Sequence, residues 1–252
     1  MKLHSQWRTL VVLATFLVVA TFFFTRPVMI QNQSYHQFID TRSFFGIPNA
    51  MDVLSNVLFA LVGFLGIQEV AIRQPALVTK KSWFWFFLSV LLIAPGSAYY
   101  HLSPNDATLV WDRLPMSGAF MALYVVLLSE HMTLKSEKYL FPALMFGVLS
   151  VVTWVITTDL RFYIMVQYGS FVTIPLILML FPSRFTLKFY YFIILVMYGL
   201  AKWAEAKDQK IYEISSALIS GHTLKHVLAA LGLLALWWMV RTRSDEGERL
   251  NS

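Results

Sequence analysis

The sequence predicts an all-α, polytopic membrane protein, and three observations carry this prediction. Of the 252 residues, 58% are hydrophobic and only 13% are charged, half of the ~25% usual for a soluble domain. The apolar residues gather in long runs, and the polar segments that separate these runs are short. A water-soluble fold of this size would leave too much apolar surface exposed, so a soluble enzyme is excluded.

Eight apolar stretches are long enough for membrane helices, each of which needs about 20 residues to cross ~30 Å of hydrocarbon. The predicted spans are Thr9–Phe24, Ala50–Val70, Trp83–His101, Leu109–Ser129, Tyr139–Thr157, Tyr163–Phe181, Phe185–Ala204 and Ala217–Val240. No joining segment has room for a soluble domain, so the helices form one membrane domain.

The first stretch follows a basic start, with Lys2 and Arg8, and resembles a secretory signal. No small-x-small cleavage site stands before Arg26-Pro27, so we expect an uncleaved anchor helix. The predicted organisation is an N-terminal anchor helix at 1–30, an outer loop at 31–48, a membrane domain at 49–240 and a cytoplasmic tail at 241–252.

The distribution of Lys and Arg predicts the orientation of the chain. More of them lie in the segments that share a side with the N-terminus than in the opposite segments, which places both termini in the cytoplasm. The formal net charge is +6, but its scatter between apolar runs indicates membrane topology, with no nucleic-acid partner. Nothing in the sequence indicates an obligate protein partner.

Three histidines in the predicted spans are candidate metal ligands. His101 ends the third span, and His222 and His226 lie one turn apart in the last. Their predicted depth is the same outer half of the membrane. The chain has no cysteine, which excludes thiolate metal sites, disulfides and cysteine nucleophiles. Three neutral imidazoles suit Zn²⁺ and leave the fourth position for water, whose pKa the ion lowers toward ~7.

Two further side chains at this depth have predicted catalytic roles. Asp112 is the candidate base that takes a proton from the zinc-bound water and passes it to a leaving amine. Ser97, one turn inward from His101, is the candidate donor to an oxyanion, although a serine in a membrane helix also bonds back to its own backbone. Asn49, Asp52 and Asn56 share one helix face, and we interpret them mainly as ties between helices.

These residues together resemble the alkaline ceramidase family. The pattern is Ser97-x-x-x-His101, then Asp112, then His222-x-x-x-His226 in the final helix. The family belongs to a wider superfamily of seven-helix metal hydrolases that includes the adiponectin and progestin receptors. The resemblance spans residues 40–240, so it implies a seven-helix core bundle with the first helix as one additional N-terminal transmembrane helix.

The resemblance implies a zinc-dependent hydrolase that cleaves the amide of ceramide-like lipids to a sphingoid base and a fatty acid. It assigns zinc to His101, His222 and His226, water activation to Asp112 and transition-state stabilisation to Ser97. Eukaryotic members also bind calcium through an acidic segment, but here that stretch offers Asp40 and mostly neutral residues, with Asn49 near the place of an acidic ligand. The resemblance therefore does not carry calcium over.

The resemblance also indicates where the protein lies, and two alternative functions stay open. As a bacterial-type member, the chain is expected in a bacterial inner membrane, with the active site toward the outer leaflet. One alternative is a receptor or transporter in which zinc is structural. The other is a retinal protein, with Lys225 of the last helix forming the Schiff base; this lysine is expected to point away from the histidine face.

Overall fold

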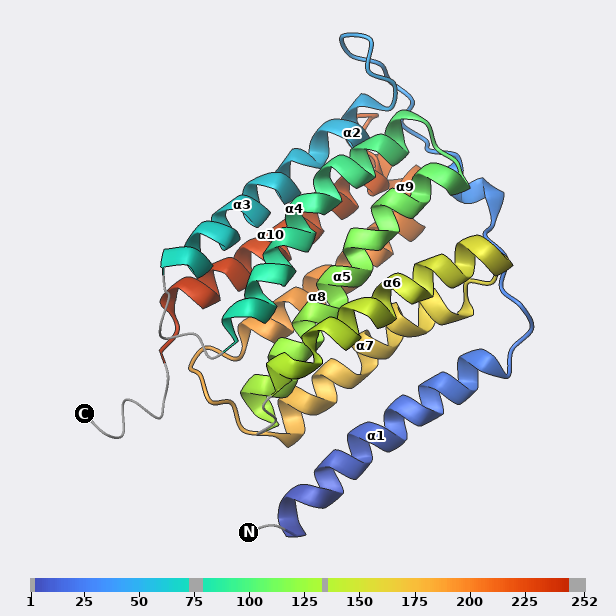
Figure 1. The fold of residues 1–252 in the computed structure, drawn as a ribbon. Helices are drawn as coiled ribbons and strands as arrows, with labels where there is room; N and C mark the ends of the chain where they lie inside the picture. The colour runs from blue at the N-terminus through green and yellow to red at the C-terminus, as the bar shows by residue number, and fades with distance from the viewer. Residues whose placement is uncertain (1–2, 73–78, 133–135, 245–252) are drawn as a thin grey trace.

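The computed structural model describes residues 3–72, 79–132 and 136–244, and their regular structure is helical apart from one isolated β-bridge between Phe44 and Ile47. The long helices run side by side in one bundle (Figure 1). The α-helices are α1 Leu3–Phe24, α2 Ala50–Ser55, α3 Val57–Ile72, α4 Lys80–Leu102, α5 Asp106–His131, α6 Leu140–Thr157, α7 Arg161–Leu180, α8 Tyr190–Ala206, α9 Asp208–Ile214 and α10 Gly221–Thr242. Two 3-10 helices, η1 Gln33–His36 and η2 Ser136–Tyr139, complete the elements.

Seven helical segments of the described chain are long and apolar enough to cross a membrane, which makes the protein an all-α polytopic membrane protein. They are Gln6–Phe24, Ala50–Ile72, Lys80–Leu102, Asp106–His131, Glu137–Thr157, Arg161–Leu180 and Gly221–Thr242. The first of them is the predicted N-terminal helix.

The predicted arrangement of eight spans, a seven-helix core plus one, is wrong in its count. The expected span Phe185–Ala204 becomes helical only at Tyr190, and α8 has 17 residues. The segment before α8 forms turns instead: Leu187 has a positive φ of 64°, and the Thr186 amide donates to the Ser244 carbonyl at 3.1 Å. These tertiary contacts replace the first turn that the apolar sequence suggested.

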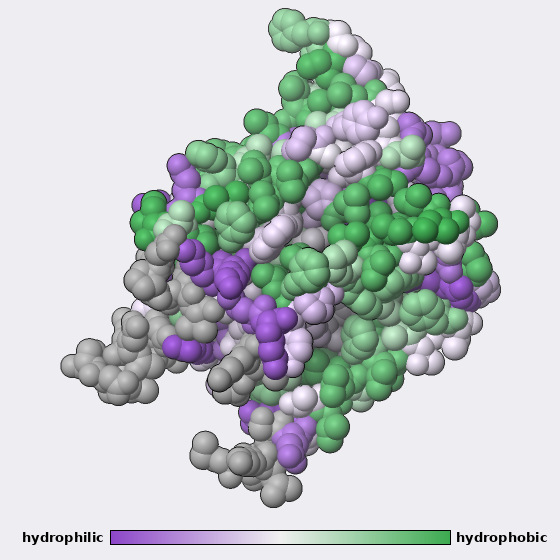
Figure 2. All heavy atoms as spheres, in the orientation of Figure 1, coloured by the Kyte–Doolittle hydropathy of each residue, from purple (hydrophilic) through white to green (hydrophobic). Residues whose placement is uncertain are grey.

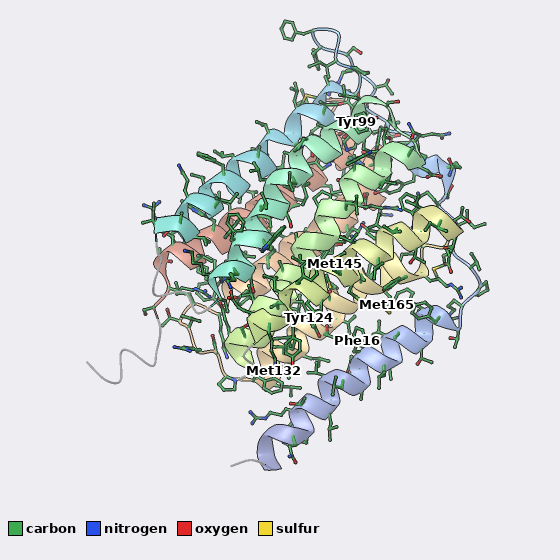
Figure 3. All side chains as sticks on the ribbon, in the orientation of Figure 1. Phe16, Tyr99, Tyr124, Met132, Met145 and Met165 are labelled. Atoms are coloured by element: carbon green, nitrogen blue, oxygen red, sulfur yellow. The ribbon has the colours of Figure 1, made fainter. Side chains whose placement is uncertain are left out.

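The helices pack around α5, which contacts α4, α6 and α7, while α8 packs against α10. Hydrophobic residues cover the visible side of the bundle, and hydrophilic residues gather toward its two ends (Figure 2). Helix α1 lies at the edge and contacts α7; Phe16 of α1 packs in a cluster with Met165 of α7 (Figure 3). Only 6% of the apolar stretch in α1 is buried.

One end of the bundle is covered by residues 25–49, the segment between α1 and α2, which we call the cap. Its backbone joins the bundle where the Leu160 amide donates to the Met29 carbonyl at 2.8 Å. The predicted span that follows the cap is broken at Asn56 into α2 and α3. At the other end, the predicted cytoplasmic tail is described only to Ser244, and α10 continues through its first residues to Thr242.

Candidate metal centre and cavity

The three predicted metal ligands meet at the cap end of the bundle. His101 comes from the last turn of α4, and His222 and His226 come from the first two turns of α10. One ring nitrogen from each lies within 4.8 Å of the other two, and the ring centroids are 4.8–5.1 Å apart. All three side chains are buried, so this cluster is a candidate metal centre.

Polar side chains at the helix ends hold the histidines in place. Ser220 caps α10, accepting a hydrogen bond from the Thr223 amide at 2.9 Å, which starts the helix just before His222. Asp52 of α2 accepts from the Thr223 hydroxyl at 2.6 Å, and Asn49 donates its amide to the His101 carbonyl at 2.8 Å. Asn49 and Asp52 therefore join α2 to α4 and α10.

Asn56, the third residue of that face, does not join helices. Its side-chain amide donates to the Asp52 carbonyl of its own turn at 2.7 Å, the local bonding that polar side chains offer near helix breaks.

The hydrogen bonds around His226 leave one ring nitrogen free for an ion. The Ser55 hydroxyl donates to the Asp52 carbonyl at 3.0 Å, so its oxygen accepts from His226 Nδ1, 2.7 Å away. Nδ1 therefore carries the proton, and Nε2 keeps a free lone pair. Metal-bound histidines are typically held in this way through their other nitrogen.

The other two imidazoles also fit a metal ion. His101 Nδ1 is fully buried and has no hydrogen-bond partner among the described residues, which is costly for a ring nitrogen unless something else fills the site. The Lys225 ammonium lies 2.8 Å from His222 Nε2, which accepts its hydrogen bond as part of a neutral ring; an ion bound at this nitrogen would take the place of the ammonium. The donor set of three neutral imidazoles is one that zinc prefers.

The contact between Lys225 and His222 corrects one prediction. Lys225 does not point away from the histidines: its ammonium reaches His222 and, at 3.0 Å, the Glu205 carboxylate of α8. Glu205 also accepts from Lys202 at 2.7 Å and from the Tyr35 hydroxyl at 3.0 Å. One carboxylate thus holds two ammonium groups beside the metal centre.

The cap supplies a residue that sequence reasoning missed. The Phe38 ring packs on His101 and His222, with centroids 4.7 and 4.6 Å apart. His36, two residues earlier, contacts the Tyr100 hydroxyl and the Asp106 carboxylate, both at 2.9 Å. The cap therefore covers the cluster with an aromatic ring and is tied to α4 and α5. No pattern of spacing in the loop distinguishes Phe38 from its neighbours.

The two predicted catalytic residues are neighbours. The Ser97 side chain of α4 and the Asp112 carboxylate of α5 lie close together at the wall of one cavity. The close approach depends on Gly96, because a Cβ built there would overlap the Trp111 carbonyl oxygen. Both side chains are at least nine-tenths buried.

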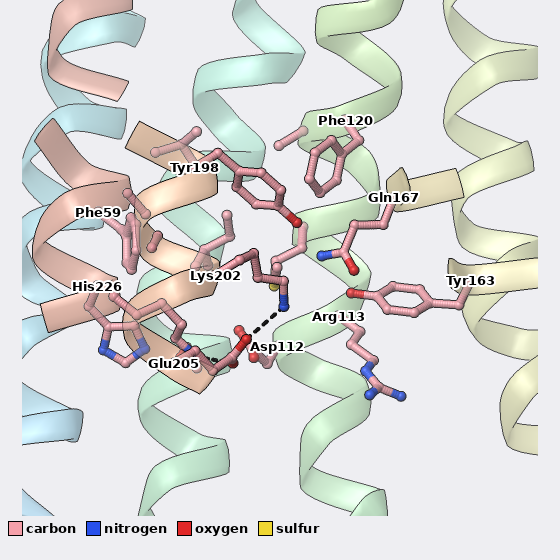
Figure 4. A pocket seen from close by; sticks show the side chains of 18 of the residues that line it. Phe59, Asp112, Arg113, Phe120, Tyr163, Gln167, Tyr198, Lys202, Glu205 and His226 are labelled. Carbon is pink, nitrogen blue, oxygen red and sulfur yellow. Dashed lines mark hydrogen bonds and ion pairs between the residues drawn. The ribbon is translucent and has the colours of Figure 1, made fainter. Parts of the chain in front are cut away.

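Asp112, Ser97 and His226 line one cavity of about 350 Å³. Figure 4 shows Asp112, Lys202, Glu205 and His226 gathered in one part of it. The rest of the lining is mainly apolar and comes from the deeper parts of the helices, including Phe86, Ile93, Met116, Leu123, Ile194 and Leu233. From Asp112 to Leu123 along α5 the cavity extends about 16 Å, at 1.5 Å per residue.

No protein-family model matches this chain, and no curated protein or solved structure matches it. The likeness to alkaline ceramidases therefore stays a resemblance carried by the five site residues. The structure itself adds that these five residues, which come from three helices, lie in one cluster and its adjoining cavity.

The acidic residue considered for calcium is engaged in an ion pair. Asp40, the acidic residue of the cap segment, receives hydrogen bonds from Arg42 at 2.8 and 2.6 Å. The carboxylate thus neutralises a guanidinium in this structure.

Proposed function

We propose that the protein is a zinc-dependent intramembrane amide hydrolase that cleaves ceramide-like lipids to a sphingoid base and a fatty acid. The observation that carries the proposal is the cluster of three buried imidazoles beside a cavity that contains Asp112 and Ser97. His101, His222 and His226 would hold the ion. Bound there, zinc supplies Lewis acidity to a carbonyl oxygen and lowers the pKa of water.

Asp112 and Ser97 divide the remaining chemistry. Asp112 accepts the proton of the attacking water at a carboxylate oxygen and later delivers it to the leaving amine. Ser97 lines the cavity beside Asp112, and its hydroxyl would donate a hydrogen bond to the oxygen that becomes negative. Gly96 lets α4 approach α5 closely enough to keep these two side chains together.

The cavity supports a lipid substrate. Its charged groups gather toward the cap end, and the lining toward the middle of the bundle is mainly apolar, as an acyl chain with a polar end requires. We place the protein in a bacterial inner membrane with both termini cytoplasmic and the site toward the outer leaflet. The lipid enters between helices, and no protein partner is needed.

The test is lipid mass spectrometry after incubation of lipid extracts with purified protein. We expect a fatty acid and its matching amine with the wild type and neither with His226→Ala. His131→Ala is the matched control, because His131 is equally buried but lies at the other end of α5, and it should retain the products. Absence of products with the wild type, or products with His226→Ala, would contradict the proposal.

The alternative of a receptor or transporter with a structural metal makes a different prediction for Asp112→Asn. In a hydrolase this variant keeps its metal and loses turnover, whereas a structural site gives no turnover to lose in the wild type. For the retinal alternative, the Lys225 ammonium is held by Glu205 and His222 and is a poor nucleophile in that form. We expect no visible absorption band on adding retinal.

A further inference from the structure

The charged groups of the cavity do not balance. Its lining includes the cations Arg113, Lys202 and Lys225 and the anions Asp112 and Glu205, which leaves one positive charge in excess even before a metal ion is bound. Charge inside a membrane protein is costly unless it is compensated. A neutral lipid would leave this excess in place, while an anionic group would neutralise it.

Lys202 has the donors to bind such a group. An ammonium has three N–H donors, and Lys202 uses one on Glu205 at 2.7 Å, with no other acceptor among the described residues. Its side chain is 30% exposed, and Figure 4 shows its ammonium pointing into the cavity near Asp112. Lys225, by contrast, donates hydrogen bonds to both Glu205 and His222.

The surroundings of Arg113 also favour an anionic ligand in the cavity. Its guanidinium lies over the Trp154 and Tyr163 rings at 4.2 and 4.8 Å and donates to Gln31 at 2.6 Å. No carboxylate within the described ranges forms an ion pair with it, and its buried Nη1 has no hydrogen-bond partner. Lys202 and Lys225 share the Glu205 carboxylate, whereas Arg113 has no carboxylate partner among the described residues.

We propose that the cavity takes an N-acyl lipid whose polar end carries an anionic group, a phosphate or a carboxylate, and that the Lys202 ammonium binds that group. This inference rests on the proposed function for the amide that is cleaved. Glu205 positions the ammonium, and the acyl chain follows the apolar lining.

A binding experiment tests the inference without turnover. Hexadecyl phosphate and hexadecanol share a chain and contain no amide, and their affinities for the purified, metal-loaded protein can be measured by native mass spectrometry in a neutral detergent. The wild type should bind the phosphate about tenfold more tightly or better, as a charge-assisted hydrogen bond provides. Lys202→Gln should remove this preference, and Lys202→Arg should retain it.

The matched control is Lys210→Gln, which removes an exposed lysine outside the cavity and should leave the preference unchanged. Equal affinity for the two lipids in the wild type, or a preference that persists in Lys202→Gln, would overturn the inference.

A hydrolysis experiment separates this inference from the proposed function. N-palmitoylglycine and N-palmitoylethanolamine differ in the polar end but share the acyl chain and the amide, and we expect faster release of palmitate from the glycine conjugate. If neither is cleaved while the binding preference holds, hydrolysis fails and the anion site stands. If only the neutral lipid is cleaved, the anion site fails and hydrolysis stands.

Discussion

Ser55→Ala should weaken metal binding although Ser55 is not a ligand. The serine oxygen accepts from His226 Nδ1 at 2.7 Å, and this bond fixes which nitrogen faces the cluster. Loss of such a partner typically costs 10–100-fold in metal affinity. We expect a loss of about tenfold, or ~1.4 kcal/mol, at the lower end of this range.

The assay is competition for zinc between the purified protein and a chromogenic chelator. Ser82→Ala is the matched control, because Ser82 is also buried in a helix but its hydroxyl has no hydrogen-bond partner in the described structure. It lies about 28 Å from His101 along α4, at 1.5 Å per residue. An unchanged affinity in Ser55→Ala, or an equal loss in both variants, would refute the reasoning.

Three further predictions test the surroundings of the site. Gly96→Ala should lower turnover about 100-fold, because the added methyl would push α4, which carries Ser97, away from α5. The control Gly199→Ala should leave turnover unchanged, because its Cβ would meet open space. Equal rates for the two variants would contradict the packing argument. Glu130→Ala should destabilise the protein by about 3–5 kcal/mol in thermal unfolding, because it removes the buried carboxylate that binds the Arg243 guanidinium at 2.7 Å; an unchanged midpoint would contradict this. Burial raises the pKa of Asp40, but hydrogen bonds from Arg42 outweigh it and the net shift is downward. This contact therefore stabilises the cap above pH ~4 and is lost as the pH falls through the lowered pKa. Hydrogen exchange of the cap amides should become faster over that pH range. An identical pH profile in Arg42→Gln would contradict the prediction.

The histidine cluster could be predicted because its signals are local. Two histidines one turn apart must share a helix face, and the position of His101 at the end of its span gives its depth. Ionisable residues are rare enough inside membranes that those present stand out. The three histidines can therefore be predicted to lie at the same depth, and in the structure they also face one another.

Other parts of the site depend on tertiary contacts that sequence spacing does not encode. Phe38 reaches the histidines because the cap folds back over the bundle. The shortened start of α8 depends on a backbone contact with Ser244, far along the chain. Glu205 had a signal that sequence reasoning overlooked: Lys202-x-x-Glu205 places opposite charges one turn apart at the end of an apolar helix.

The most direct test of the account is the metal content of the purified protein. The claim is that His101 of α4 and the two histidines of α10 hold one ion together. Elemental analysis of protein prepared without chelators should give one zinc per chain in the wild type and its loss in each of the His101→Ala, His222→Ala and His226→Ala variants. A wild type without stoichiometric zinc, or a His101→Ala variant that keeps it, would contradict the account.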